Sequence, residues 1–357
     1  MDNNIKIIPF GGVRENGKNM YAVEIEDQIF ILDTGLKYPE NELMGIDVVI
    51  PDWEYLREHK DKIVGVFLTH GHADSIGALP YFLMDFNVPV FGSEMTIALA
   101  KLAVKNHKEV KKFNDFHVVD ASTAIDFNDV TVSFFQTTHT IPETLGVVLE
   151  TKAGNIVYTG DFKFDQTAKK GYQTDLARLA EIGSQGVLAL LSDSAGAGIT
   201  GASAREQDIG DYIKETFKYQ NGRIIVASVA SNIMRVQQII NAAVAVGRKI
   251  VLSGKDIEQI IDTAMSLGKL HLPDDLFISR KEAEKLEPNQ VVILETGKMG
   301  EPIKSLQQIA NGDNPNLQLT STDLVFVTTT PSYAQETEVQ KTKDMIYRTG
   351  AEVKFIS

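Results

Sequence analysis

The sequence predicts an α/β protein of two domains, the first mostly β with interspersed helices and the second doubly wound. Up to about Leu191, short apolar or alternating runs are cut by turn residues. From about Arg205, buried strand-like runs alternate regularly with helical stretches of a dozen or more residues. A length of 357 residues suits two domains, and 43% apolar with 23% charged residues is typical of a soluble globular protein.

The first half is predicted to consist of strands with two helices among them. Strand-like runs cover residues 21–32, 64–68, 130–135 and 146–158, and the last of these is a hairpin that turns at Ala153-Gly154-Asn155. Helices are predicted at residues 76–86 and from 94 to about 106, each after a strand-like run.

The second half is predicted to form a sheet of buried strands at residues 224–229, 249–252, 291–294 and 324–327. A helical apolar stripe is predicted to face the core; it comprises Ile233, Val236, Ile239, Ile240 and Ala243. A last strand-like run, 352–356, stops at Ser357, and we expect from this abrupt end that the native protein continues further.

Charge and composition exclude several classes of site. The net charge of −13 repels nucleic acid and anionic membranes at long range, so any contact with RNA must be local. Because the chain has no cysteine, it has no disulfide, no thiolate nucleophile and no cysteine zinc site. The first apolar stretch, residues 5–10, is too short for a signal peptide or a membrane span. We therefore expect a cytoplasmic protein that does not bind membranes.

The most informative segment is His70-Gly71-His72-Ala73-Asp74, which directly follows a buried strand. Two histidines two residues apart in an extended chain point the same way, and Gly71 is expected to let the backbone turn so that both imidazoles reach one ion. Asp74 adds an oxygen ligand nearby. This spacing predicts a metal site.

Three other strands end in polar residues of the same kind. His139 follows the strand at 130–135, Asp161 follows the strand that ends near Tyr158, and Asp33 follows the strand at 30–32. We expect the four strand ends to converge on one sheet edge, with Asp33 as an orienting carboxylate behind the ligands. The remaining histidines, His59, His107, His117 and His271, are interpreted as structural.

Other motifs admit a functional and a plainer interpretation. The segment 196–201 reads G-x-G-x-x-G, but no acidic residue ends the next strand, so a hinge between the domains is favoured over a dinucleotide site. Scattered lysines form either a basic edge for RNA or an ordinary solvated face; they are Lys163, Lys169 and Lys170. Tyr172 and Tyr333 are base-stacking candidates or, more simply, packing and surface residues.

At this point the sequence resembles a known family. The metallo-β-lactamase fold has successive motifs similar to Leu32-Asp33-Thr34-Gly35, His70-Gly71-His72-Ala73-Asp74, Thr138-His139 and Thr159-Gly160-Asp161. The β/α domain after Asp193 resembles a β-CASP domain. Bacterial ribonuclease J has segments similar to Gly45-Ile46-Asp47, residues 76–81 and 138–142, Gly160-Asp161-Phe162-Lys163-Phe164-Asp165, Leu191-Ser192-Asp193-Ser194 and residues 309–312.

This resemblance implies a fold and an activity. The fold is a metallo-β-lactamase αββα sandwich (residues 1–205) with an inserted doubly wound β-CASP domain (206–345), after which 346–357 begin the return to the first domain. The implied activity is ribonuclease J-type RNA processing and decay, by 5′-3′ exonuclease or endonuclease cleavage, including maturation of rRNA and mRNA. A small-molecule hydrolase of the lactamase kind is disfavoured by the inserted domain.

The resemblance also implies the roles of site residues. The metal ligands are His70, His72, Asp74, His139 and Asp161, of which Asp74 and Asp161 are also catalytic. The chain departs from the family at Ser75, which replaces a ligand histidine, and at Lys298-Met299, where Ser-Gln is usual. The family's later histidine segments would follow Ser357. Because serine is a poor ligand, we expect one Zn²⁺ or Mn²⁺ ion, or none.

The pattern most resembles the second, weakly active ribonuclease J paralogue. This implies RNA as a partner, association with an active ribonuclease J paralogue, and a homo- or hetero-oligomer. Two interpretations follow: a weak metal-dependent ribonuclease, or a non-catalytic structural subunit of a ribonuclease J complex.

Overall fold

The computed structural model describes residues 4–39, 45–165, 167–169, 171–198, 200–201, 205–254, 257–296, 302–328 and 336–356. The chain divides into two compact units, Met1–Ser203 and Ala204–Ser357. None of the helices in the described ranges combines the length and the apolar composition that crossing a membrane requires. Lys170, Lys298, Met299 and Tyr333, singled out in the sequence, lie outside the described residues.

Two sheets form the centre of the first unit. One has the strand order β1-β2-β3-β4-β5-β6 and the other β11-β10-β9-β8-β7. The strands of the first sheet are β1 (Ile5–Gly11), β2 (Met20–Ile25), β3 (Gln28–Leu32), β4 (Ile63–Phe67), β5 (Val90–Gly92) and β6 (Phe116–Val118). Those of the second are β7 (Ala124–Phe127), β8 (Val130–Gln136), β9 (Leu145–Thr151), β10 (Gly154–Tyr158) and β11 (Val187–Leu191).

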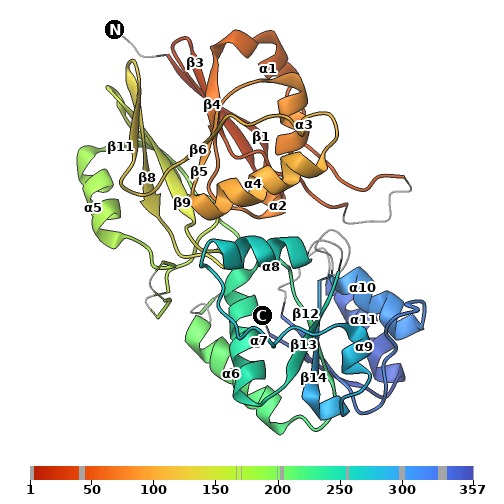
Figure 1. Cartoon of the computed structure of the whole chain (residues 1–357). Helices are drawn as coiled ribbons and strands as arrows, with labels where there is room; N and C mark the ends of the chain where they lie inside the picture. Colours follow the sequence, from red (N-terminus) through yellow and green to blue (C-terminus); the bar gives the residue numbers. More distant parts are fainter. Residues whose placement is uncertain are drawn as a thin grey trace. The chain divides into compact units, whose positions relative to one another are not determined.

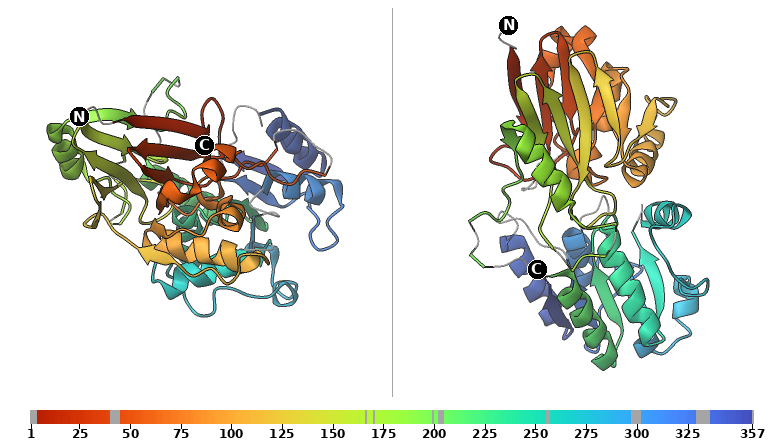
Figure 2. Two further views of the ribbon diagram at one scale, coloured as in Figure 1. Left: turned by 90° about the horizontal axis from the view of Figure 1, so that it is seen from above. Right: turned by 90° about the vertical axis from the view of Figure 1, so that its left-hand side faces the viewer.

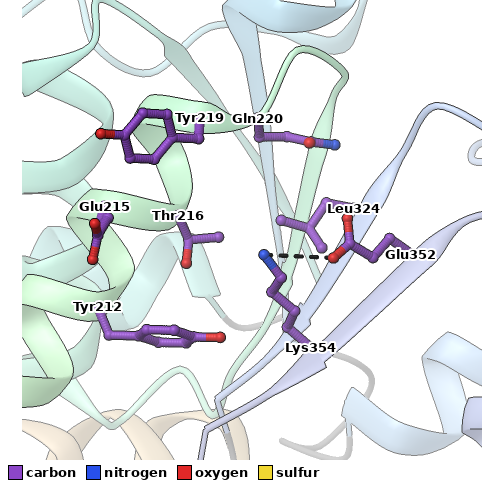
Figure 3. A pocket seen from close by; sticks show the side chains of 8 residues that line it. All are labelled: Tyr212, Glu215, Thr216, Tyr219, Gln220, Leu324, Glu352 and Lys354. Atoms are coloured by element: carbon purple, nitrogen blue, oxygen red, sulfur yellow. Dashed lines mark ion pairs between the residues drawn. The ribbon is translucent and has the colours of Figure 1, made fainter.

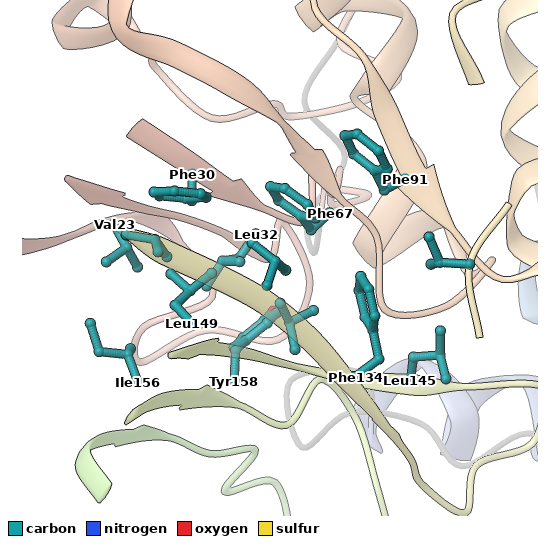
Figure 4. Packing of buried hydrophobic residues seen from close by; sticks show 14 of the residues in the cluster. Val23, Phe30, Leu32, Phe67, Phe91, Phe134, Leu145, Leu149, Ile156 and Tyr158 are labelled. Carbon is teal, nitrogen blue, oxygen red and sulfur yellow. The ribbon is translucent and has the colours of Figure 1, made fainter. Parts of the chain in front are cut away.

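The core of this unit lies between the two sheets. Phe30 and Phe67 from the first sheet and Phe134 and Leu149 from the second are fully buried and face one another (Figure 4). Such apolar burial is the main favourable term in folding. The outer faces carry helices, with α1, α3 and α4 beside one sheet and α5 beside the other (Figures 1 and 2). This confirms the predicted αββα sandwich.

The helices of the first unit follow its strands. They are α1 (Glu54–Glu58), α2 (Ala73–Ile76), α3 (Leu79–Asp85), α4 (Glu94–Asn106) and α5 (Leu176–Gln185), with a 3₁₀ turn at Lys60–Lys62. The predicted single helix at 76–86 is wrong, because α2 and α3 are separate. Pro80 has no N–H to bond the Ile76 carbonyl, so the helix breaks and the Ala78 N–H bonds Thr34 instead.

The run at 21–32 is likewise two strands rather than one. Glu26, at φ 52°, begins a two-residue turn between β2 and β3, which pair antiparallel. Glutamate rarely adopts this left-handed conformation, so the sequence carries no turn signal there. The second hairpin is present as predicted, although Gly154 already pairs with Thr151 and the turn is therefore at 152–153.

The second unit is built on a five-stranded parallel sheet of order β13-β14-β12-β15-β16. Helices α6 and α7 lie on one side of it and α9, α10 and α11 on the other (Figure 1), which confirms the doubly wound prediction. Its strands are β12 (Ile224–Ala227), β13 (Lys249–Ser253), β14 (Val291–Glu295), β15 (Leu324–Val327) and β16 (Glu352–Phe355). Its helices are α6 (Glu206–Tyr219), α7 (Ile233–Ala245), α8 (Ile257–Ser266), α9 (Arg280–Ala283), α10 (Pro302–Asn311) and α11 (Glu336–Arg348), with a 3₁₀ turn at Pro288–Gln290.

The apolar stripe predicted on α7 is confirmed as core, since each of its five members is fully buried. Residues 346–357 were expected to begin a return segment. In the structure, those described contribute the end of α11 and strand β16, which pairs with β15 in the sheet of the second unit.

Candidate metal centre

The candidate ligands lie at strand ends, but on two sheets rather than one. Asp33 and His70 follow β3 and β4 of the first sheet, whereas His139 and Asp161 follow β8 and β10 of the second. The prediction of a single sheet edge is therefore wrong. The sequence shows that strands end in polar residues, but it does not show that the chain changes sheets between them.

His70 and His72 occupy the short link between β4 and α2. His70 is fully buried, and His72 is the extended residue that precedes α2. Gly71 has no positive φ, so the expected tight turn is not the reason for glycine. A Cβ at position 71 would lie 2.6 Å from Leu99 Cδ1 and 3.2 Å from Ile141 Cδ1. Close packing, not backbone conformation, requires glycine here.

Three imidazoles meet in one place. The ring centroids of His70, His72 and His139 are 4.8 Å apart in every pair, with interplanar angles of 83°, 78° and 68°. The Nε2 atom of His139 lies 3.0 Å from Nδ1 of His72. Three mutually tilted rings with clustered nitrogen atoms are the arrangement that a single Zn²⁺-like ion requires.

Two carboxylates form a second group around the same histidine. Ligand atoms of His70, Asp74 and Asp161 lie within 4.8 Å of one another, as do those of the three imidazoles. His70 belongs to both groups, and its Nε2 is 3.6 Å from Asp74 Oδ1. The structure thus brings together all five predicted ligands, but it places Asp161 with Asp74 and His70 rather than with all three imidazoles.

Glycine also positions Asp161. Gly160 has a φ of +58°, and a Cβ there would lie 2.8 Å from the Thr69 side chain. The backbone between β10 and Asp161 therefore needs glycine both for its conformation and for its close approach to the strand end that carries His70. A side chain at 160 would push these two strand ends apart.

Asp33 orients this assembly from behind. It is fully buried and has a φ of 59°, a conformation that costs a non-glycine residue about 1–3 kcal/mol. Three hydrogen bonds offset that cost: Thr69 N–H donates to Oδ1 at 2.8 Å, while Thr69 Oγ1 and the Tyr158 hydroxyl donate to Oδ2 at 2.8 and 2.9 Å. Asp33 thus holds the start of the histidine motif.

The hydroxyl of Thr69 connects Asp33 to His70, since Thr69 Oγ1 lies 2.9 Å from His70 Nδ1. A hydroxyl has one proton, and Thr69 donates it to the Asp33 carboxylate. The Nδ1 atom of His70 must therefore be the donor in the other hydrogen bond. In neutral His70 this leaves the lone pair on Nε2, the atom that faces Asp74 and the metal-ligand groups.

Burial and mutual charge shift the pKa values of several groups in the centre. Burial alone would lower the pKa of His70, but the close contact with Asp74 and the charges of Asp161 and Asp33 raise it to about 9. Burial raises the pKa of Asp161 to about 7 and that of Asp33 to about 6. Burial, with the charges of His70 and His72, holds the pKa of His139 well below its usual value.

These shifts favour a positive charge in this space. Asp74 keeps a lowered pKa despite burial, because its close contact with His70 and the charges of His70 and His72 favour the ionised form. Without an ion, the proton on His70 supplies the countercharge for the surrounding carboxylates. Buried His70 Nε2, Asp74 Oδ1 and Ser75 Oγ have no hydrogen-bond partner among the described residues. The donor set therefore fits a divalent cation that displaces this proton.

Sequence reasoning missed Thr69 and Tyr158, which together with Asp33 form the hydrogen-bonded support of His70. A signal existed, because Thr69 directly precedes His70 and Tyr158 ends the strand before Asp161. The described ligand groups contain none of the histidines that were interpreted as structural. Among these, His59 stacks on Tyr55 at 4.2 Å, and exposed His117 bonds Asp115 at 2.8 Å.

A cavity of about 290 Å³ lies apart from these groups, within the second unit. Tyr212 and Tyr219 of α6 line one side of it, and the Lys354–Glu352 ion pair at 3.5 Å lines the other (Figure 3). No histidine lines it, so it is not a further imidazole site.

Comparison with known proteins matches both units. Residues 13–183 match the metallo-beta-lactamase superfamily, and residues 221–346 match the ribonuclease J beta-CASP domain. Ribonuclease J 2 of Streptococcus pyogenes is 55% identical over 354 residues, which cover 99% of this chain and 64% of that protein. The chain is thus homologous to ribonuclease J 2 over nearly its whole length.

Other ribonuclease J 2 proteins are similar over the same extent. Ribonuclease J2 of Bacillus subtilis is 42% identical over 352 residues, covering 99% of this chain and 63% of that protein. The chain thus spans a little under two thirds of these relatives. A crystal structure of an Enterococcus faecalis protein of unknown function matches with a TM-score of 0.68 and 14% identity, over 98% of this chain and 87% of that one. At this identity, the match supports the fold alone.

Proposed function

We propose that the chain is a metal-dependent ribonuclease of the ribonuclease J type, acting in RNA processing and decay with weak intrinsic activity. The observation that carries the proposal is the cluster of three mutually equidistant imidazoles. One of them, His70, also belongs to a second ligand group with two carboxylates. Similarity to ribonuclease J 2 supports RNA as the substrate.

In this proposal His70, His72 and His139 would hold one Zn²⁺ or Mn²⁺ ion, and Asp161, which lies with His70 and Asp74, would join them as a further ligand. When bound, the ion would neutralise negative charge that develops on the phosphate during hydrolysis. Asp33 and Thr69 keep the His70 lone pair on Nε2, the nitrogen that belongs to the ligand groups.

Asp74 acts as the proton acceptor. In this proposal its carboxylate accepts a proton from the water whose oxygen attacks phosphorus, while the bond from phosphorus to the leaving oxygen breaks. Ser75 stands where the family has a second-ion ligand, and its hydroxyl is buried and uncharged. A second ion would therefore bind weakly, which leaves Asp74 available for proton transfer and makes hydrolysis slow.

Metal content and hydrolysis test this proposal. After dialysis against metal-free buffer, elemental analysis is expected to find at most one transition-metal ion per chain. With added Mn²⁺, the chain is expected to hydrolyse 5′-monophosphorylated RNA slowly, and His70→Ala to abolish the reaction. The matched control is His117→Ala, which removes an exposed histidine outside the centre. Two retained ions, or equal activity of His70→Ala, would overturn the proposal.

We further propose that the chain associates with an active ribonuclease J paralogue, and that it forms a homo- or hetero-oligomer. The altered ligand at Ser75 supports a role in which the partner performs most of the cleavage. The rival function is a purely structural subunit. Replacing the gene with a His70→Ala, His72→Ala form decides between them. If partner binding persists while RNA processing fails, the centre does essential chemistry; if processing is unchanged, the subunit is structural.

A further inference from the structure

The loop that follows Asp161 exposes an aromatic ring, and the mechanism above does not use it. Of the 17 phenylalanines, all of which lie in the described ranges, only Phe164 is exposed, with 61% of its surface accessible. A largely exposed phenyl ring forgoes part of the free energy that burial would give it. An exposed ring on an active-site loop is therefore a candidate contact for another molecule.

Phe164 is held on a fixed backbone. The preceding Lys163 donates its N–H to the Thr138 carbonyl at 2.9 Å. The following Asp165 is buried, and its Oδ1 accepts the N–H and the hydroxyl of Thr167 at 2.8 and 2.6 Å. The ring itself packs against Phe162, with centroids 5.3 Å apart and planes at 72°. The exposed face is thus preorganised, which reduces the entropy lost on binding.

This loop adjoins the metal centre. Asp161 lies three residues before Phe164, and the bridge between Lys163 and Thr138 places the loop beside the residue that precedes His139. In extended chain, alternate residues share a side, which agrees with the contact of Phe162 with Phe164. Phe164 therefore lies on the rim of the centre and is a contact for substrate next to the reacting bond, not for the reacting atoms.

The surroundings of the ring select one class of ligand. Lys163 directly precedes Phe164, and exposed Lys169 follows five residues later in the chain, although the whole chain has a net charge of −13. Proteins that bind single-stranded nucleic acid combine cationic groups for the phosphates with aromatic rings on which bases stack. A protein partner would require a larger apolar patch, whereas a single exposed ring between lysines matches one nucleotide.

We propose that Phe164 is a stacking platform for one base of single-stranded RNA next to the cleaved bond. This inference rests on the proposed ribonuclease function and adds a positioning residue to it. Stacking would hold the strand in register across the metal centre. It therefore contributes to substrate binding more than to the chemical step.

The test compares the intact chain with Phe164→Ala, Phe164→Trp and a control, Tyr219→Ala. Tyr219 is an exposed aromatic residue near a lysine in the second unit and has no part in the proposal. Binding of short single-stranded RNA is measured by fluorescence anisotropy, and hydrolysis is measured with Mn²⁺. Phe164→Ala is expected to weaken binding about 5- to 150-fold and to raise KM without lowering kcat, while Phe164→Trp restores binding.

A series of RNAs, each with one abasic position, shows whether a base is the ligand. One position is expected to weaken binding to the unaltered chain as much as Phe164→Ala does, and to leave binding to Phe164→Ala unchanged. Equal binding by Phe164→Ala and the unaltered chain would overturn the stacking inference alone. If the unaltered chain binds RNA through Phe164 but never hydrolyses it, the proposed function fails and the stacking platform stands; if it does not bind RNA, both fail.

Discussion

Replacing Asp33 by Asn tests the support of His70 with a change of one atom. Asp33 accepts three hydrogen bonds on two oxygens, and asparagine has one oxygen and one NH₂ group. With its oxygen toward the Thr69 N–H, the asparagine donates to Thr69 Oγ1. The Thr69 hydroxyl must then turn its own proton toward His70 Nδ1. Because Nδ1 then accepts a hydrogen bond, the proton of neutral His70 must lie on Nε2. Nε2 then has no lone pair to bind a metal ion.

The magnitude follows from this tautomer change. Loss of a partner that orients a ligand histidine typically costs 10- to 100-fold in metal affinity, or about 1.4–2.7 kcal/mol. We expect Asp33→Asn to weaken Zn²⁺ binding by this amount, as measured by competition with a chromophoric chelator. Tyr158→Phe is the matched control, because it removes one donor to Asp33 but leaves the chain from Asp33 through Thr69 to His70 intact.

The two variants separate orientation from general destabilisation. Circular dichroism and thermal unfolding should show both variants folded at the assay temperature. If Asp33→Asn binds Zn²⁺ as tightly as the unaltered chain, or if Tyr158→Phe loses as much affinity, the tautomer argument is refuted. If the unaltered chain binds no divalent ion, the metal proposal itself is refuted.

Three more predictions concern other parts of the first unit. Hydrogen bonds from Tyr55, Lys6 and Lys62 lower the pKa of Glu24 to about 2, so ionised Glu24 stabilises the fold above pH 4.5, its ordinary pKa, and this contribution is lost as the pH falls from 4.5 toward 2. Because the lysines are exposed, we expect Glu24→Gln to lower the free energy of unfolding in urea by about 2 kcal/mol at pH 7 and by almost nothing near pH 2. An equal loss at both pH values would contradict this. Gly71→Ala should destabilise the chain by about 1–3 kcal/mol, because its Cβ would overlap Leu99, and an unchanged melting temperature would contradict the packing argument. Ser75→His, in a protein that continues to its natural end, should bind a second ion by elemental analysis and raise hydrolysis with Mn²⁺; a second ion without faster hydrolysis would place the defect elsewhere.

The sequence predicted the elements whose signals are local. Buried runs bounded by turn residues predicted β15 at its observed ends and the other strands of the parallel sheet to within two residues. The helix at Glu94–Asn106 was also predicted at its observed ends. By contrast, the break between α2 and α3 was not predicted, although Pro80 is visible in the sequence. Whether Pro80 breaks a helix depends on whether the chain is already helical at Ile76, and the apolar pattern does not determine this.

The centre shows the same division between local and long-range information. The spacing of His70, His72 and Asp74 fixes their proximity within a few residues, and this is why the motif is informative. That Tyr158 reaches Asp33, 125 residues away along the chain, depends on how the two sheets pack. The left-handed conformation of Asp33 is equally invisible in the sequence, because no glycine marks it.

The energetics of the centre favour a bound divalent cation. A fold gains nothing from burying Asp33, Asp74 and Asp161 around a single protonated histidine. Burial raises the pKa of Asp33 and of Asp161, so at neutral pH their ionised forms weaken the metal-free fold. The left-handed backbone of Asp33 adds a further cost. A bound cation removes most of the charge penalty at once. The arrangement is therefore destabilising without an ion and is stabilised by a divalent ion, which supports the proposed metal site.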